Sequence, residues 1–177
     1  MVGFDTIFYD DTKHGRKIKR EDYLTEGTTP IIDQGQDYIS GYCNDEDGVY
    51  NTVPALIFGD HTRIIKYVDF PFYLGADGVK VLKSKNPDAN YKYLYYLLKA
   101  HKIPNTGYNR HFKYLKEAMF VEHTQTEQKD IVDQLDKISS IIDKRKSQLG
   151  EMDNLIKSRF VYLFLFKIAS SASFREG

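Results

Sequence analysis

The feature that most constrains this chain is a heptad pattern in the last third of its 177 residues. Apolar side chains recur at alternating spacings of four and three residues, and a single arginine interrupts them. Such a pattern predicts one long helix, over residues 126–160, which at 1.5 Å per residue is about 50 Å long. The positions of this seam are Ile131, Leu135, Ile138, Ile142, Arg145, Leu149, Met152 and Ile156.

The strict period of the seam indicates what the helix packs against. A repeat of 3.5 residues keeps one apolar stripe facing a partner helix, and a helix of about 50 Å exceeds the diameter expected of the preceding domain. We therefore expect the helix to project and to pair with another helix, with Arg145 setting the register. A helix that lies across the sheet of its own domain is the alternative that the sequence leaves open.

The first half of the chain has short, strand-like patterns instead. Strands are expected at residues 4–9, 54–58, 63–68 and 79–82. A helix is expected at residues 89–102, with Asp88 as its N-cap. The fold class that follows is α+β: a globular domain of short, mostly antiparallel strands with a few helices, followed by a long coiled-coil helix.

The net charge of the chain is zero, which taken alone argues against a DNA-binding protein. The balance hides segments of opposite sign, because residues 1–78 carry a net charge of −7 and residues 79–116 carry +8. Residues 117–153 and 154–177 carry −4 and +3. Six tyrosines are interleaved with the cations of the basic window, residues 79–116, as in a phosphate-contacting surface. A solvated helix face over a tyrosine-rich core is the alternative.

The sequence holds no spacing that is typical of a catalytic or metal site. The five histidines are scattered with no pair at i,i+4, and Cys43 is the only cysteine. Glycine-rich cofactor loops and nucleophile elbows are missing. We therefore expect a binding protein without metal or cofactor. One cysteine, no signal-peptide pattern, and an apolar stretch at residues 160–169 that is too short for a bilayer predict a cytoplasmic protein without a membrane partner.

Two polar segments, residues 59–63 and 105–111, have the composition of recognition loops. Arginine and asparagine can make paired hydrogen bonds to base edges, and glycine lets backbone amides approach a phosphate. Hydrogen-bonded turns are the alternative for each segment. The candidate DNA-contacting residues are Arg16, Lys17, Gln34, His61, Thr62, Arg63, Lys80, Lys83, Lys85, Tyr108, Asn109, Arg110 and His111.

Several stretches of the chain, in their order and spacing, resemble a target recognition domain of a type I restriction-modification specificity subunit. They are residues 30–35, 57–63 and 70–82, followed by residues 93–98, which are similar to the family's helix after its central strands. The pair Glu127-Gln128 before the heptads resembles the start of the family's conserved helical spacer. The resemblance covers residues 4–160. The family's proline-rich approach to the Glu-Gln pair is replaced here by residues 121–126.

The resemblance implies a protein without catalytic residues of its own. It would hold methyltransferase (modification) subunits, and through them restriction subunits, on one sequence of double-stranded DNA. Full-length members usually contain two recognition domains and two antiparallel spacer helices, whereas this chain has one of each and resembles a half-subunit. The expected organisation is a recognition domain at residues 1–124, a spacer and dimerisation helix at 125–160, and an atypical tail at 161–177.

A half-subunit can act as a homodimer. Two copies related by a twofold axis would pair their seams in antiparallel orientation and place one recognition domain at each end, so that the dimer reads a split palindromic site. The other function left open is a coiled-coil interaction or decoy fragment, which binds a modification subunit without reading DNA.

Overall fold

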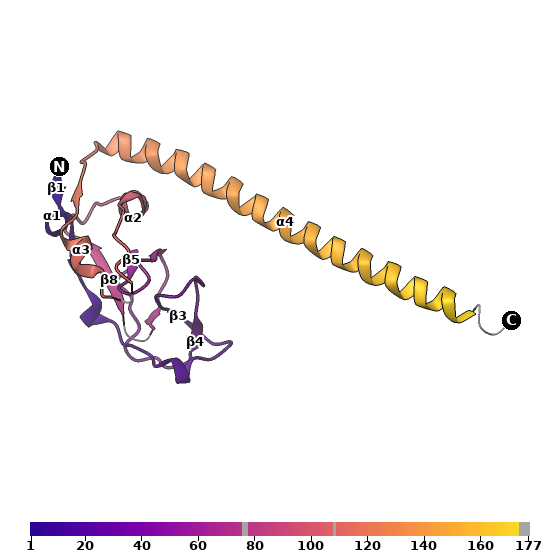
Figure 1. The fold of residues 1–177 in the computed structure, drawn as a ribbon. Helices are drawn as coiled ribbons and strands as arrows, with labels where there is room; N and C mark the ends of the chain where they lie inside the picture. Colours follow the sequence, from indigo (N-terminus) through magenta and orange to yellow (C-terminus); the bar gives the residue numbers. More distant parts are fainter. Residues whose placement is uncertain (76–77, 108, 174–177) are drawn as a thin grey trace. The chain divides into compact units, whose positions relative to one another are not determined.

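The structure is a computed structural model that describes residues 1–75, 78–107 and 109–173, with the backbone alone for residues 165–173 (Figure 1). The chain divides into two compact units, Met1–Val132 and Asp133–Gly177. The first unit holds the sheets, and the second continues the long helix that starts in the first.

The strands of the first unit are short. They are β1 (Val2–Gly3), β2 (Phe8–Asp10), β3 (Thr29–Ile32), β4 (Gly41–Cys43), β5 (Ala55–Gly59), β6 (Ile65–Val68), β7 (Tyr73–Leu74), β8 (Val79–Ser84) and β9 (Met119–Phe120). The helices are α1 (Phe4–Ile7), α2 (Tyr91–Ala100), α3 (Phe112–Lys116) and α4 (Gln125–Ser173), with 3-10 turns η1 (Thr12–His14) and η2 (Arg20–Asp22). The strands expected at residues 54–58, 63–68 and 79–82 correspond to β5, β6 and β8.

The central sheet has the strand order β2-β8-β5-β6 and is antiparallel throughout. Leu56 pairs with Leu82 and Ile57 with Val81 at its centre. A second sheet has the order β4-β3-β7, in which β3 pairs with β4 antiparallel and with β7 parallel. Strands β1 and β9 form a separate antiparallel pair. The predicted α+β class with mostly antiparallel strands and a long C-terminal helix is confirmed.

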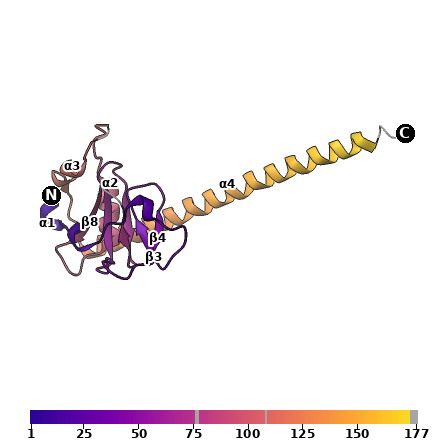
Figure 2. The ribbon, with the colours of Figure 1, turned by 90° about the horizontal axis from the view of Figure 1, so that it is seen from below.

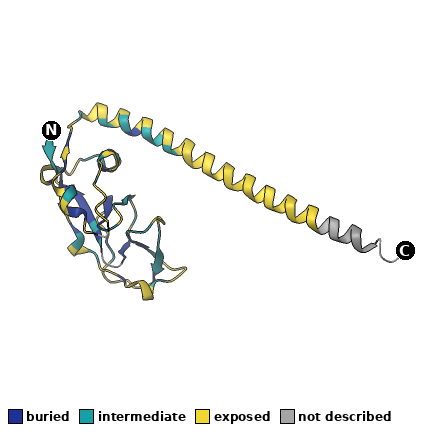
Figure 3. Cartoon of the chain, viewed as in Figure 1, coloured by how far each residue is buried: buried dark blue, intermediate teal, exposed yellow. Residues whose placement is uncertain are grey.

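Alternate residues of β5 serve two different cores, because successive side chains of a strand point to opposite faces. Leu56 and Phe58 pack in a cluster that contains residues of α2 and α3. Ala55 and Ile57 pack in another, which contains residues of β3 and β7. The central sheet is thus covered by helices on one face and by the second sheet on the other, and the buried residues concentrate in these strands (Figures 2 and 3).

The strand expected to start at Phe4 is wrong, because residues 4–7 form the helical turn α1 and the strand begins at Phe8. The apolar spacing of Phe4 and Phe8 fits one face of a helical turn as well as a strand. Both side chains are 1% exposed and their ring centroids lie 5.1 Å apart. The packing of these two rings on the same side of the chain therefore favours a helical turn over a strand at residues 4–7.

The cap of α2 is also two residues later than expected. Asn90, and not Asp88, is the N-cap, and its side chain accepts a hydrogen bond from the Tyr93 amide at 3.1 Å. The Asp88 amide instead donates to the side chain of Asn86 at 3.0 Å, in a turn before the helix. Asn and Asp are comparably good caps, so composition alone does not separate these positions.

The long helix predicted from the heptads is present. Helix α4 begins at Gln125 and continues past Phe160 to Ser173. Within the described residues, no helix combines the length and the apolar character that crossing a membrane requires.

Candidate nucleic-acid interface

Asp60 joins the two polar segments that the sequence singles out. It lies directly after β5 and is 4% exposed. Its backbone carbonyl accepts hydrogen bonds from the His111 amide at 2.8 Å and from His111 Nδ1 at 3.0 Å. Its carboxylate accepts a further hydrogen bond from the Phe112 amide at 2.7 Å. Residues 59–63 and the loop that ends at His111 therefore lie side by side, although they are 51 residues apart in the sequence.

His111 anchors this loop from inside the protein. Its side chain is fully buried, and because a carbonyl oxygen can only accept, Nδ1 carries the proton that it donates to Asp60. Nε2 lies 3.4 Å from the hydroxyl of Thr106 in the same loop. His111 was a candidate for DNA contact, but here it positions the loop and does not reach the surface.

The neighbours of His111 carry the exposed chemistry of the loop. Asn109 is exposed, and its side-chain amide donates to the Thr106 carbonyl at 2.7 Å. Arg110 is exposed and makes no ion pair with any residue that the structure describes. Tyr108, the other candidate in this segment, lies outside the described residues.

Gln34 forms a second junction beside the same turn. Its side-chain oxygen accepts from the His61 amide at 3.1 Å, and its carbonyl accepts from the Thr62 hydroxyl at 2.7 Å. Gly78 packs directly against this pair, with φ of 92°, and a Cβ there would lie 2.7 Å from Gln34 Nε2. Gln34, His61 and Thr62, three of the sequence-predicted residues, are therefore brought together at the end of β5.

The loop after Gln34 is held in place by Asp33. The Asp33 carboxylate accepts from the Gly35 amide at 2.7 Å and from the Ser40 hydroxyl, and it lies 3.7 Å from Lys66 Nζ. Lys66 is 5% exposed and donates to the carbonyl of Asp37 at 2.6 Å. Burial lowers the pKa of Lys66 below its usual value, while the charges of Asp33 and Asp37 act in the opposite direction.

A polar cavity of about 410 Å³ lies beside this loop and includes side chains that sequence reasoning missed. Arg20, Gln36 and Asp37 line it together with Gln34 and Thr62. The signal that could have found Gln36 is the polar Gln-Gly-Gln sequence that follows the apolar residues Ile31 and Ile32. Asp60 was missed as well, because its role depends on a partner segment far along the chain.

The remaining candidate cations are engaged in local contacts. Arg16 pairs with Asp45 at 2.7 Å, and Lys80 pairs with Asp10 at 2.9 Å. Burial raises the pKa of Asp10, but hydrogen bonds from Thr12 and Lys80 outweigh this effect and the pKa is lowered overall.

Two more of these candidate lysines bind backbone carbonyls. Lys83 is 7% exposed and donates to the carbonyls of Thr52 and Pro54, at 3.1 and 2.7 Å. Lys85 is exposed and donates to the carbonyl of Asp5, and Lys17 is exposed beside β7. The structure does not bring Lys83 to the surface on which Arg110 lies.

The basic window therefore contributes fewer exposed cations than its sequence suggests. Apart from Lys85, those that are exposed come from α2, α3 and the loop between them. Lys99 lies over the ring of Tyr95 at 5.0 Å, and Lys113 lies over the ring of Tyr114 at 4.9 Å. The interleaved tyrosines thus support lysine side chains on the surface, through cation–π contacts.

The start of α4 is anchored by the Glu-Gln pair. The Thr124 amide and hydroxyl donate to the Glu127 carboxylate at 2.7 and 2.8 Å, and the Glu127 amide donates back to the Thr124 hydroxyl at 3.3 Å. This is a capping box, which satisfies backbone donors at a helix N-terminus. The hydrogen bonds from Thr124 lower the pKa of Glu127 below its ordinary value.

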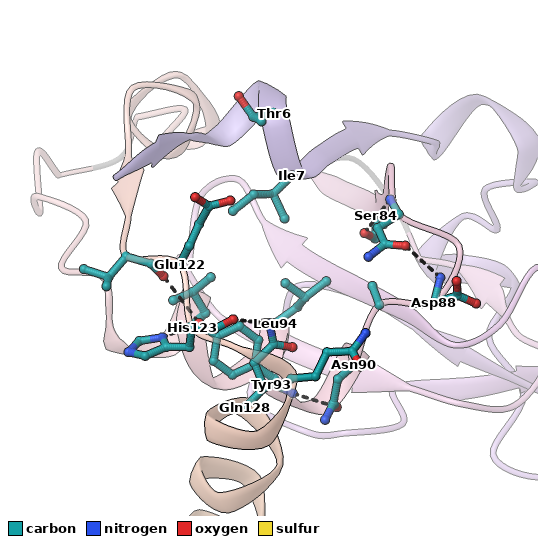
Figure 4. Close-up of a pocket in the computed structure, with 15 residues that line it drawn as sticks. Thr6, Ile7, Ser84, Asp88, Asn90, Tyr93, Leu94, Glu122, His123 and Gln128 are labelled. Carbon is teal, nitrogen blue, oxygen red and sulfur yellow. Dashed lines mark hydrogen bonds between the residues drawn. The ribbon is translucent and has the colours of Figure 1, made fainter.

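Gln128 and His123 link this cap to α2 (Figure 4). The Gln128 side chain donates to the His123 carbonyl at 2.9 Å, and His123 Nδ1 lies 2.7 Å from the hydroxyl of Tyr93. These residues line a cavity of about 550 Å³, which also includes residues of α1 and the loop before α2. The pair Glu127-Gln128 therefore has a structural role where α4 begins.

The seam of α4 is largely exposed in the single chain (Figure 3). Ile131 and Leu135 are half-buried, whereas Arg145 is exposed and donates to Gln148 at 3.1 Å. The exposed fractions of the other seam residues are 52% for Ile138, 47% for Ile142, 62% for Leu149, 58% for Met152 and 65% for Ile156. Among the described residues, no group of histidine, cysteine or acidic side chains is arranged to hold a metal.

Comparisons with known proteins relate this chain to one family. It is 33% identical over 100 residues to the type I restriction enzyme EcoR124I/EcoR124II specificity subunit of Escherichia coli, which is 55% of this chain and 24% of that protein. No protein-family model matches the sequence.

Solved structures share the fold. The S subunit of the type I restriction-modification system from M. genitalium matches with a TM-score of 0.60 and 21% identity, over 85% of this chain and 40% of that one. A structure concerning complex assembly and conformational transition of the type I R-M system matches with a TM-score of 0.61 and 17% identity, over 88% and 42%. The HsdS subunit from Thermoanaerobacter tengcongensis matches with a TM-score of 0.50 and 16% identity, over 80% and 37%.

The chain spans less than half the length of each of these proteins. The partial coverage fits one recognition domain followed by one spacer helix, as the resemblance implied. Sequence similarity and shared fold together confirm that resemblance: this chain is similar to the type I restriction-modification specificity subunits over less than half of their length.

Proposed function

We propose that this chain recognises a specific sequence of double-stranded DNA as a non-catalytic specificity component of a type I restriction-modification system. The observation that carries the proposal is the junction at Asp60, which joins two polar segments 51 residues apart in the sequence. Thr62 is exposed on the first of these segments, and Asn109 and Arg110 are exposed on the second. Relatedness to specificity subunits supports the same role.

The exposed side chains suit the two tasks of a DNA interface. Arg110 and Asn109 can make paired hydrogen bonds to guanine and adenine edges in the major groove. The exposed lysines of α2 and α3 supply the phosphate contacts that hold the duplex in register. The buried His111 holds the end of their loop against Asp60, directly after Arg110.

The proposal extends to assembly through α4. Burial of the exposed seam residues in an antiparallel homodimer would remove apolar surface from water, which is the main favourable term in such associations. The dimer would carry two copies of the recognition surface and read a split palindromic site. It would dock methyltransferase subunits, and through them restriction subunits.

Selection from a pool of randomised DNA duplexes tests this function directly. We expect the purified chain to enrich duplexes that contain an inverted repeat with a fixed spacing. Arg110→Ala should then weaken binding to the selected duplex by about 1–3 kcal/mol and relax the preference at one position of each half-site. The exposed Lys129, on the second turn of α4, provides the control: Lys129→Ala removes one charge and should leave the preference unchanged.

Failure to enrich any sequence would contradict the proposal. If the same protein nevertheless co-purified with a modification subunit, the result would favour the interaction or decoy fragment over a DNA-reading subunit.

A further inference from the structure

We propose that Arg63, Lys99 and His101 form a seat for a phosphate group beside the turn at residues 60–63. The inference rests on the proposed DNA binding and assigns these residues to the DNA backbone rather than to a base. Three independent features of this place support it: the backbone conformation of Arg63, the environment of its guanidinium group, and the charge of the cavity that it lines.

Arg63 adopts a left-handed backbone conformation, with φ of 62°. This region is sterically unfavourable for a residue with a Cβ, and glycine would occupy it without that strain. The turn itself is closed by backbone hydrogen bonds, from the Arg63 amide to the Gly59 carbonyl at 2.7 Å and from the Gly59 amide to the Ile64 carbonyl at 2.8 Å. An arginine at this position therefore strains the backbone of the turn. The hydrogen bonds that close the turn do not require the arginine side chain.

The guanidinium group of Arg63 is only partly satisfied. One terminal nitrogen donates to the carbonyl of Ile103 at 3.3 Å. The Nε atom is buried and has no hydrogen-bond partner within the described part of the chain. An unsatisfied donor on a charged group is costly, and the other terminal nitrogen, which has no hydrogen-bond partner among the described residues, can bind an oxyanion, the acceptor that a guanidinium group matches best.

The cavity beside Arg63 has the charge that a phosphate needs. Its volume is about 440 Å³, and its polar lining comes from Arg63, Lys99, His101 and Thr62. No carboxylate lines it, and the rest of the wall is apolar, from Leu98 and the isoleucines of the turn, β6 and the loop after α2. Lys99 is held over Tyr95, where its Nζ donates to the hydroxyl at 3.2 Å. An apolar wall without an opposing negative charge strengthens attraction to an oxyanion.

The cavity shares one lining residue with the polar cavity beside Gln34. Thr62 lines this cavity and also the polar cavity on the other side of the turn, next to Gln34 and Gln36. A phosphate held by Arg63 would therefore set the position of the strand whose bases meet the turn. Such contacts fix register on the duplex and carry no sequence information themselves.

Two measurements on the full chain test the seat. In the first, inorganic phosphate is titrated while the Nε–H resonance of Arg63 is followed by NMR, and we expect this resonance to shift saturably. In the second, the affinity for a random-sequence duplex is measured against salt concentration. Each neutralised phosphate contributes about 0.9 to the slope of log K against log salt, so Arg63→Gly should reduce the slope by about 1 for every sequence.

The variants separate binding from folding. Arg63→Gly relieves the left-handed strain and should melt at the same or a higher temperature, while Arg63→Lys keeps a charge but lacks Nε and should retain part of the slope. Lys99→Ala should lower the slope as well, and Lys129→Ala, outside the cavity, serves as the control. If Arg63→Gly changes the preference for one base and leaves the slope unchanged, Arg63 reads a base and the seat is wrong.

The two proposals can fail separately. If the chain binds no specific DNA sequence but the Arg63 resonance shifts with phosphate, the proposed function is wrong and the phosphate seat is supported. If the chain selects a DNA sequence but shows neither the resonance shift at Arg63 nor the change in salt slope, the proposed function is supported and the phosphate seat is wrong.

Discussion

His111 donates two hydrogen bonds to the same carbonyl oxygen of Asp60, one from its amide at 2.8 Å and one from its ring at 3.0 Å. A buried carbonyl that accepts twice uses both of its lone pairs, so this junction is fully satisfied. The exposed Asn109 and Arg110 therefore follow a backbone that is fixed from the interior of the domain.

Removal of the His111 ring should loosen this junction. We expect His111→Ala to lower the free energy of unfolding by about 2–4 kcal/mol, because it leaves a cavity and removes a buried hydrogen bond. His111→Asn supplies a side-chain donor near the Nδ1 position and should recover part of the loss. Urea denaturation of both variants measures the difference, and equal stability of the two would show that the ring hydrogen bond contributes nothing.

Gly78 should be intolerant of a side chain because of Gln34. In Gly78→Ala the new Cβ meets Gln34 at 2.7 Å and His61 at 2.9 Å, in a backbone with φ of 92°. Gly107, with φ of 77° and no atom within 4 Å of its Cβ position, is the matched control. We expect Gly107→Ala to cost about 1 kcal/mol from the backbone alone, and Gly78→Ala to cost about 1–3 kcal/mol more. Thermal unfolding of the two variants gives the comparison, and equal costs would contradict the close packing.

The cap of α4 should depend on acid pH through Glu127. Hydrogen bonds from Thr124 lower the pKa of Glu127 in the folded protein below its ordinary value of 4.5. A lowered pKa means that folding favours the ionised carboxylate, so its contribution is complete above pH 4.5 and is lost as the pH falls through the folded value.

Hydrogen exchange of the amides of residues 124–128 measures this dependence. We expect protection of the first turn to fall as the pH decreases below 4.5 in the original chain. Glu127→Gln keeps an acceptor but does not titrate, so its protection should change little over the same range. An identical fall in both proteins would assign the effect to another carboxylate.

The α4 seam should control the oligomeric state. Light scattering of the purified chain is expected to give twice the chain mass of 20.6 kDa. Ile142→Asp places a charge in the apolar interface and should weaken association by about 3 kcal/mol or more, to give a monomer at micromolar concentration. Ser140→Asp adds the same charge at an exposed position outside the seam and should remain dimeric. A monomeric original chain would overturn the proposed homodimer.

Sequence patterns were sufficient to predict those elements whose structure depends on residues close together in the sequence. The heptads predicted α4, and the apolar run before Gly59 predicted β5, because residues three, four or two apart decide these elements. The same logic fails at Phe4, whose spacing from Phe8 fits a turn of helix and a strand equally. It also placed the α2 cap at Asp88 instead of Asn90, because two good capping residues compete there.

The candidate site, too, could be predicted only in part from the sequence. The polar composition of residues 59–63 and 105–111 marked both segments, but nothing in either one reveals that Asp60 joins them. Lys83 and Arg110 are equally basic in the sequence, and only the fold buries the first against backbone carbonyls and leaves the second exposed.

The sequence by itself determined the long helix, the mostly antiparallel α+β class and the relation to specificity subunits, because periodicity and motif spacing are local properties of the chain. The tertiary structure alone decided that His111 is an interior anchor, that Asp60 is the junction of two loops, and that Arg63 carries an unsatisfied buried nitrogen. The physical reason is that burial and hydrogen-bond satisfaction depend on segments about fifty residues apart, whose contact no local pattern records.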